Sequence, residues 1–132
     1  MITFEKESNI FTYRVVGVAI HNNKVLVHKS IHDDFWSLPG GRCEFLELSK
    51  DALIREMIEE IGVKIEIIRT LYFVENFFFF NKKNYHELSI FYLIEIPVTF
   101  KKVFENDSFF GRESELGTEE DAIYGKEFDL IF

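Results

Sequence analysis

The chain has 132 residues, 47% of them hydrophobic, which suffices for one compact core without disulfide staples. Its only cysteine, Cys43, excludes an internal disulfide framework and fits a cytoplasmic protein, and no segment resembles a signal peptide or a membrane span. The net charge of −8 argues against a nucleic-acid duplex as the main partner, because phosphate backbones require a basic surface.

The first half of the chain predicts a hairpin followed by a glycine-containing loop. Val15–Ile20 and Val25–His28 are short β-type runs, and Asn22-Asn23 between them suits a hairpin turn. The segment from Trp36 to Gly41 (WSLPGG) then interrupts regular structure, because proline and paired glycines disfavour helices and strands. No repeat, linker or low-complexity segment follows, so residues 1–132 are expected to form a single domain.

A helix is predicted from about Ser49 to Ile61, with Ser49 as its N-cap and Gly62 at its C-terminal end. At about 100° per residue, Glu56, Glu59 and Glu60 share one narrow arc of this helix. The opposite side carries an apolar stripe that can face a core, made of Leu53, Ile54, Met57, Ile58 and Ile61. Arg55 stands four residues before Glu59, a spacing at which the two side chains can pair.

The second half of the chain predicts mainly strands. Three β-rich stretches are Val63–Ile68, Leu71–Phe79 and Leu88–Ile96, with a turn at Asn81-Lys82-Lys83-Asn84 between the last two. The polar segment Glu105–Asp121 is expected to be a loop, and a weaker β-type run, Glu127–Phe132, follows. Strands around one strong helix favour the α/β class, with a mixed β-sheet.

The three glutamates of the helix can be interpreted in two ways. Clustered carboxylates repel one another unless something compensates, and a hard cation such as Mg²⁺ or Mn²⁺ suits a set of oxygen ligands. No Cys or His spacing in the sequence suits zinc. The alternative is a solvated acidic face of a surface helix, and the three residues alone leave both interpretations open.

The flanking residues resemble the sequence signature of a known family. Gly41 is followed after five residues by Glu47, and Glu47 is followed after seven residues by Arg55–Val63 (REMIEEIGV). This pattern fills every specified position of the Nudix box. One departure is Leu46, where many members have glycine before the glutamate.

The resemblance implies a Nudix-type α/β/α sandwich with the catalytic helix after a Gly-Gly loop. It also implies Mg²⁺ or Mn²⁺ bound by Glu56, Glu59, Glu60 and the backbone carbonyl of Gly40. Arg55 would orient a glutamate through a salt bridge. Glu47 would hold the loop against the helix.

The implied activity is metal-dependent hydrolysis of a pyrophosphate bond. Water would attack phosphorus in line, and a carboxylate would take its proton. The predicted catalytic residues are Arg55, Glu56, Glu59 and Glu113. Glu115, Glu119 and Glu120 compete with Glu113 for the late-loop role, and a solvated loop is an equal alternative for each. Glu87 is a further candidate for the base, against the simpler interpretation of a charge on an edge strand.

Substrate binding is expected at Gly40 and Gly41, whose lack of side chains allows close approach of a phosphate. Trp36 could stack on a nucleobase or simply pack the loop. The expected ligand is a small nucleotide, with nucleoside triphosphates, nucleotide sugars and ADP-ribose all open. Cys43 has no identified base partner, so a catalytic thiol is not expected.

Two alternatives remain for the function: a Nudix-like binding or regulatory domain without catalysis, and an interaction protein with a solvated acidic helix. Family members commonly continue into a second helix, whereas this sequence ends at Phe132, soon after its last β-type run. Either the domain lacks the usual C-terminal helix, or a partner subunit covers the exposed apolar surface. On that basis the sequence predicts a homodimer. Neither a nucleic-acid duplex nor a membrane is expected as a partner.

Overall fold

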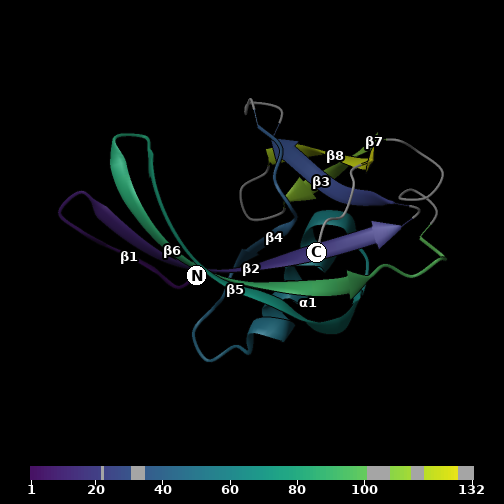
Figure 1. The fold of residues 1–132 in the computed structure, drawn as a ribbon, viewed down its shortest axis with the longest axis horizontal. Coiled ribbons are helices and arrows are strands. Elements are labelled where there is room, and N and C mark those ends of the chain that lie inside the picture. Colours follow the sequence, from purple (N-terminus) through teal and green to yellow (C-terminus); the bar gives the residue numbers. More distant parts are fainter. Residues whose placement is uncertain (22, 31–34, 101–107, 114–117, 128–132) are drawn as a thin grey trace.

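The computed structural model describes residues 1–21, 23–30, 35–100, 108–113 and 118–127 and shows a strongly curved sheet with one helix (Figure 1). In chain order the elements are β1 (Thr3–Lys6), β2 (Asn9–His21), β3 (Lys24–Ser30), β4 (Gly40–Arg42), α1 (Ser49–Ile61), β5 (Glu66–Phe80), β6 (Lys83–Glu95), β7 (Ser108–Glu113) and β8 (Thr118–Glu127).

The sheet is mixed, as the sequence predicts for the α/β class. Its strand order is β5-β6-β2-β3-β8-β7, and β1 and β4 also pair with β2. The β2–β6 pair is parallel and runs from Asn9↔Asn84 to Ala19↔Ile94, whereas the other pairs are antiparallel. Strand β2 is therefore the central element to which the N-terminal hairpin, the glycine loop and the long β5–β6 hairpin are all attached.

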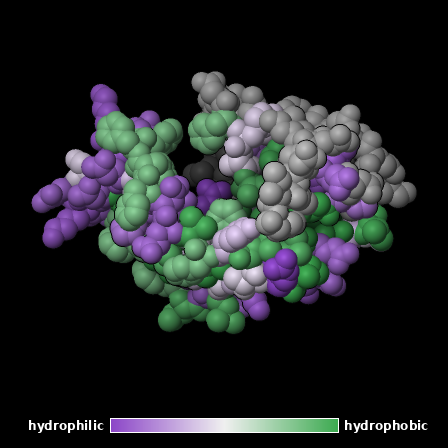
Figure 2. Space-filling view, in the orientation of Figure 1, coloured by the Kyte–Doolittle hydropathy of each residue, from purple (hydrophilic) through white to green (hydrophobic). Residues whose placement is uncertain are grey.

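Two hairpins extend from the body of the molecule and form what we call the arm. The arm comprises β1, the first residues of β2, the end of β5 and the start of β6, and it projects on the left of Figure 1. The space-filling view shows a recess between the arm and the rest of the molecule (Figure 2). The arm ends in a tight turn at Asn81 and Lys82, whose φ angles of 50° and 62° match the type I′ turns of two-residue hairpins.

The core lies between the apolar stripe of α1 and one face of the central strands. Leu53 and Met57 are fully buried there against Val15, Ala19 and neighbouring apolar residues. Complete burial of such side chains stabilises the fold by about 1.5–3 kcal/mol each. Glu56 and Glu60 are also buried, whereas Ile58 is 47% exposed. The predicted apolar stripe is therefore only partly the buried face of α1, and two residues of the predicted acidic arc lie on the buried side of the helix.

The predicted bounds of the helix are confirmed, but its predicted N-cap is wrong. Leu48 occupies the N-cap position without a side-chain hydrogen bond. Ser49 lies inside the helix, and its hydroxyl is 2.6 Å from the Tyr92 hydroxyl. The side chain that was expected to cap the helix is therefore hydrogen-bonded to β6 instead. Gly62 ends the helix with a φ of 73°, as predicted for a glycine in the left-handed region.

Several strand predictions need correction. Val63–Ile68 and Leu71–Phe79 were expected as two strands, but residues 66–80 form the single strand β5, with register irregularities at Ile67/Arg69 and Thr70/Tyr72. The predicted loop Glu105–Asp121 contains β7 and the start of β8. Pairing with β3 and β7 stabilises the polar strand β8, which has little apolar alternation of its own. The predicted closing run Glu127–Phe132 contributes only Glu127 to β8, and residues 128–132 lie outside the described residues.

Within the described ranges α1 is the only α-helix, in keeping with the expectation that the domain can lack the C-terminal helix common in the family. In that same part of the chain, no helix is both long and apolar enough to cross a lipid bilayer.

Candidate active site

The glycine loop reaches the helix through strand pairing. Gly40, Gly41 and Arg42 form β4, which pairs with Val16, Val15 and Arg14 of β2, and α1 contacts β4 and β2. Pairing fixes the loop backbone against the same strand on which the helix packs. The two halves of the Nudix-like signature therefore lie together in space.

The two glycines are required for different physical reasons. A Cβ atom on Gly40 would overlap the backbone carbonyl oxygen of Val15, and a Cβ on Gly41 would overlap the carboxylate of Glu56. Gly40 therefore permits the strand to approach β2 closely. Gly41 leaves the space that the Glu56 carboxylate occupies.

Arg55 is the centre of a hydrogen-bonded ionic network. Its Nε and Nη2 atoms donate to the two carboxylate oxygens of Glu47 at 2.9 and 3.0 Å, which is a bidentate pair. Its Nη1 donates to Glu56 at 3.0 Å and to Glu59 at 3.3 Å. Its Nη2 also donates to the Arg42 carbonyl at 3.2 Å. One guanidinium thus joins the helix, the loop and β4.

The electrostatics of the Arg55–Glu47 pair follow from this geometry. The hydrogen bond from Arg55 lowers the pKa of Glu47, and the bond to Glu47 raises the pKa of Arg55. Glu47 also accepts a hydrogen bond from the Glu44 backbone N–H at 3.1 Å. The carboxylate of Glu47 therefore stays ionised and holds the loop against the helix.

The departure of this chain from the family pattern at Leu46 has a structural consequence. Leu46 has a φ of 62°, in the left-handed region that glycine adopts most easily, and its side chain is fully exposed. The loop shape is thus retained with a leucine in a conformation that suits glycine.

Two of the three predicted metal ligands are buried carboxylates. Glu56 is 8% exposed and Glu60 is 7% exposed. A Glu60 carboxylate oxygen lies 3.7 Å from Nδ1 of His28, which comes from β3. His28 was not predicted at this site, because only the β2–β3 hairpin brings it to the helix and no local spacing signals that approach.

The donor set fits a hard divalent cation in chemistry but not in present geometry. Glu47, Glu56 and Glu59 gather around the one guanidinium of Arg55, so carboxylates outnumber the cationic side chain of the network. Oxygen-rich sites of this kind suit Mg²⁺ or Mn²⁺. Among the described residues, however, no three His, Cys, Asp or Glu groups converge as a metal site. Arg55 holds Glu56 and Glu59 while Glu60 lies beside His28, so metal binding would require side-chain rotation.

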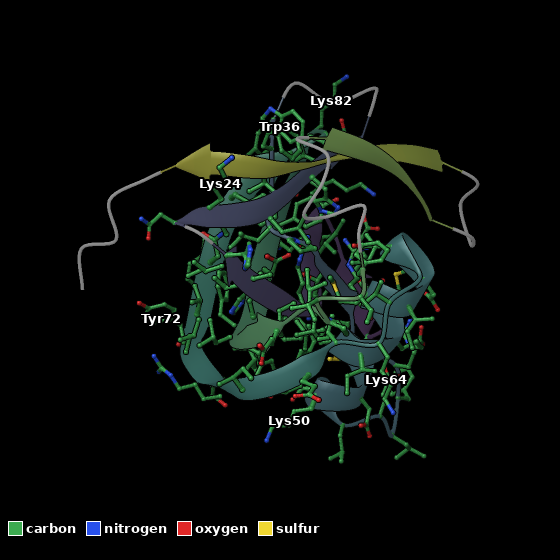
Figure 3. The ribbon with its side chains drawn as sticks, turned by 90° about the vertical axis from the view of Figure 1, so that its right-hand side faces the viewer. Lys24, Trp36, Lys50, Lys64, Tyr72 and Lys82 are labelled. Carbon is green, nitrogen blue, oxygen red and sulfur yellow. The ribbon has the colours of Figure 1, made fainter. Side chains whose placement is uncertain are left out.

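The other predicted site residues are placed as follows. Trp36 is half-buried beside Ser37, whose backbone pairs with His28, and Figure 3 shows it on the far side of the molecule from Lys50 near the start of α1. Glu113 is the last residue of β7, a strand that contacts α1. Its competitors Glu119 and Glu120 lie in β8, and Glu115 falls outside the described residues.

Glu87 was expected on an edge strand, and this prediction is wrong. It lies inside β6, which pairs with β5 on one side and with β2 on the other. Its carboxylate accepts hydrogen bonds from the hydroxyl groups of Thr12 at 3.2 Å and Ser89 at 3.3 Å.

A surface depression of about 630 Å³ also lies on the arm, lined by Asn9, Phe77, Phe78, Asn84, Tyr85 and His86. The acidic network of α1 does not contribute to that depression.

A family model described as the NUDIX domain matches residues 12–118. An RNA pyrophosphohydrolase of Ruthia magnifica subsp. Calyptogena magnifica is 40% identical over 73 residues, covering 54% of this chain and 41% of that protein. An 8-oxo-dGTP diphosphatase of Proteus vulgaris is 42% identical over 48 residues, covering 34% of this chain and 43% of that protein. The chain thus spans less than half the length of these relatives.

Solved structures show the same fold at low sequence identity. A MutT NUDIX hydrolase from Burkholderia pseudomallei matches with a TM-score of 0.65 and 20% identity, covering 92% of this chain and 89% of that one. A UDP-X diphosphatase matches with a TM-score of 0.60 and 18% identity, covering 86% of this chain and 49% of that one.

Proposed function

The chain belongs to the Nudix family, and from this premise we propose that it hydrolyses the pyrophosphate bond of a nucleoside diphosphate linked to a further group. The observation that carries the proposal is the network on α1, in which three carboxylates surround Arg55 and one of them, Glu56, fills the space left by Gly41. A solvated acidic face would need neither the bare glycine nor the buried carboxylates.

The cofactor in this proposal is Mg²⁺ or Mn²⁺, held by Glu56, Glu59, Glu60 and the Gly40 carbonyl. When bound, such an ion would withdraw charge from the diphosphate oxygens and acidify a bound water. The chain's own residues supply position and proton transfer. Arg55 restrains Glu56 and Glu59, and Glu113, in the strand beside α1, is our candidate for the carboxylate that takes the proton of the attacking water.

The experiment is a hydrolysis screen in Mg²⁺ and in Mn²⁺ with nucleoside triphosphates, nucleotide sugars and ADP-ribose. Glu59→Gln and Glu60→Gln should each lower kcat about 100- to 1000-fold, the usual scale for a group that acts on the reacting phosphate. Glu66→Gln, on the exposed start of β5, is the matched control and should leave kcat unchanged.

Two results would contradict the proposal in different ways. A rise in melting temperature with Mg²⁺ but no phosphate release from any nucleotide would favour a binding domain without catalysis. If neither cation raises the melting temperature and no nucleotide is cleaved, the acidic helix is a solvated surface.

A small nucleotide remains our proposed ligand, with a homodimer as the proposed assembly and the cytoplasm as the proposed location. The relatives named for RNA and for 8-oxo-dGTP chemistry support a nucleotide substrate without selecting one.

A further inference from the structure

Glu87 belongs to a polar row on the face of the sheet opposite the helix. Side chains alternate between faces along a strand, so Tyr92 and Ile94, which belong to the α1 side, face away from Glu87 and Ser89. The register pairs Thr12 with Glu87 and Arg14 with Ser89. The row therefore lies on the two central strands of the sheet.

The residues of this row are buried or partly buried, and Thr12, Glu87 and Ser89 are joined by hydrogen bonds. Thr12 is fully buried, Ser89 is 3% exposed, and both hydroxyl groups donate to Glu87. Among the described residues, these two neutral hydroxyl groups are the only partners of the carboxylate. Arg14, whose guanidinium donates to the Leu38 carbonyl, does not form an ion pair with it. A carboxylate has about four acceptor positions, so Glu87 keeps capacity for two further donors.

The position of Glu87 lies between an aromatic pair and the glycine loop. Two residues before Glu87 on β6, on the same face and toward the arm, Tyr85 stacks on Phe78, with an angle of 3° between the ring planes and a distance of 4.9 Å between the ring centroids. In the other direction, Arg14 donates to the Leu38 carbonyl in the loop before Gly40.

The distance from this position to the glycine loop matches a nucleotide. Gly40 pairs with Val16, which is four residues along β2 from Thr12, so the two positions are about 13 Å apart at 3.3 Å per residue. That separation is comparable with the reach of an extended nucleotide from its phosphates to the far edge of its base.

We propose that Glu87 reads the nucleobase of the substrate, accepting the two adjacent N–H donors of a guanine-type base. The base would stack toward Tyr85 and Phe78 while its phosphates reach Gly40, whose neighbour Gly41 lies against the Glu56 carboxylate. Thr12 and Ser89 are positioning residues that hold the carboxylate plane toward the base. Adenine presents an acceptor where guanine has N1–H, so a carboxylate disfavours it. This inference rests on the proposed function and assigns its base specificity.

The test compares GTP, ITP and ATP as substrates for the wild type and Glu87→Gln. Gln keeps the shape but has one acceptor oxygen in place of two, so it can accept from only one of the Thr12 and Ser89 hydroxyl groups, and its amide N–H₂ opposes the donors of guanine. We expect the KM for GTP to rise about 10- to 100-fold, the value of charge-assisted hydrogen bonds, with kcat nearly unchanged. The KM for ATP should stay equal or fall. ITP, which lacks the exocyclic amino group, should lie between GTP and ATP in the wild type.

Matched variants separate recognition from folding. Glu95→Gln, on the same face of β6 but exposed, should leave every KM unchanged. Thr12→Val should raise the KM for GTP in the same direction as Glu87→Gln but by less, and Thr12→Ser, which restores the donor, should recover the wild-type value. A melting temperature within a few degrees of the wild type confirms that each variant is folded.

Calorimetric binding of GMP and AMP without metal gives a readout independent of catalysis. The wild type should prefer GMP, and Glu87→Gln should lose that preference. An equal change in KM for GTP and ATP, or no GMP preference in the wild type, overturns the inference. If no nucleotide is hydrolysed but GMP is preferred through Glu87, the proposed function fails and the base site stands.

Discussion

At the scale of single residues, Gly40 and Gly41 lie side by side but are backed by different atoms. A Cβ on Gly41 would meet only the end of the flexible Glu56 side chain, whereas a Cβ on Gly40 would meet the backbone of Val15. We therefore expect Gly41→Ala to change the free energy of unfolding little but to displace Glu56 and lower kcat about 100-fold, the usual effect of a misplaced catalytic group.

The neighbouring substitution provides the comparison. Gly40→Ala should lower the free energy of unfolding by about 1–3 kcal/mol, because the strand must move away from β2. Urea unfolding and kcat for both variants would test this pair. Equal losses of stability in the two variants would show that a Cβ at position 41 disturbs more than the Glu56 side chain.

Cys43 connects burial to a pH dependence. Its side chain is fully buried, and burial raises the pKa of the thiol to about 11, with Glu47 adding to the effect. Below pH 9 the thiol is protonated in the folded and the unfolded chain. Between pH 9 and pH 11 it ionises mainly in the unfolded chain, so stability should fall as the pH rises through this window.

The measurement is the melting temperature of the wild type and of Cys43→Ala from pH 8 to pH 11. The wild type should lose more stability than the variant above pH 9. A native protein whose thiol reacts at pH 8 with a disulfide reagent as fast as an unfolded one would contradict the burial argument.

At the scale of elements, the turn of the arm offers a prediction about its own stability. Asn81 and Lys82 both have positive φ, and for a residue other than glycine the left-handed region costs about 1 kcal/mol. Asn-Gly is the preferred sequence for this turn. Lys82→Gly should therefore raise the free energy of unfolding by roughly 0.5–1 kcal/mol, measured by urea unfolding, with Lys64→Gly outside the turn giving no gain.

The elements that the sequence predicts well are those specified by local pattern. The helix from Ser49 to Ile61 has an apolar stripe and a terminal glycine, and both act within a few residues. Strands β7 and β8 were missed because the segment is rich in polar residues and the strands form by pairing, β7 with β8 and β8 with β3. The short strand β4 was missed because its two glycines indicate a loop, and only pairing with β2 makes this segment a strand.

The same distinction applies to the candidate site. The acidic arc and the pairing of Arg55 with Glu59 follow from helical geometry, and the structure has that pair at 3.3 Å. His28 beside Glu60, and Glu87 between Thr12 and Ser89, depend on strand register over 32 and 75 residues of sequence. No local spacing encodes such contacts, so the sequence could name Glu87 but placed it on the wrong kind of strand.

At the scale of the whole molecule, the arm exposes an aromatic row on the face opposite Glu87. Phe4, Phe11, His86 and Phe77 stand in register on four adjacent strands, with ring centroids 4.5–5.4 Å apart between neighbours. Contiguous exposed apolar surface of this kind marks interaction sites in soluble proteins.

The predicted homodimer would use this row, with one arm packed against its copy. Phe77 and Phe79, which share the face, are 68% and 70% exposed. Burying them in an interface would give a hydrophobic stabilisation that the isolated chain does not have. Sedimentation velocity at micromolar concentration should give a dimer for the wild type and a monomer for Phe77→Ser combined with Phe79→Ser. Phe45→Ser, at an exposed phenylalanine outside the arm, should remain dimeric. A monomeric wild type at that concentration would reject the dimer, while base recognition by Glu87, on the other face, would be unaffected.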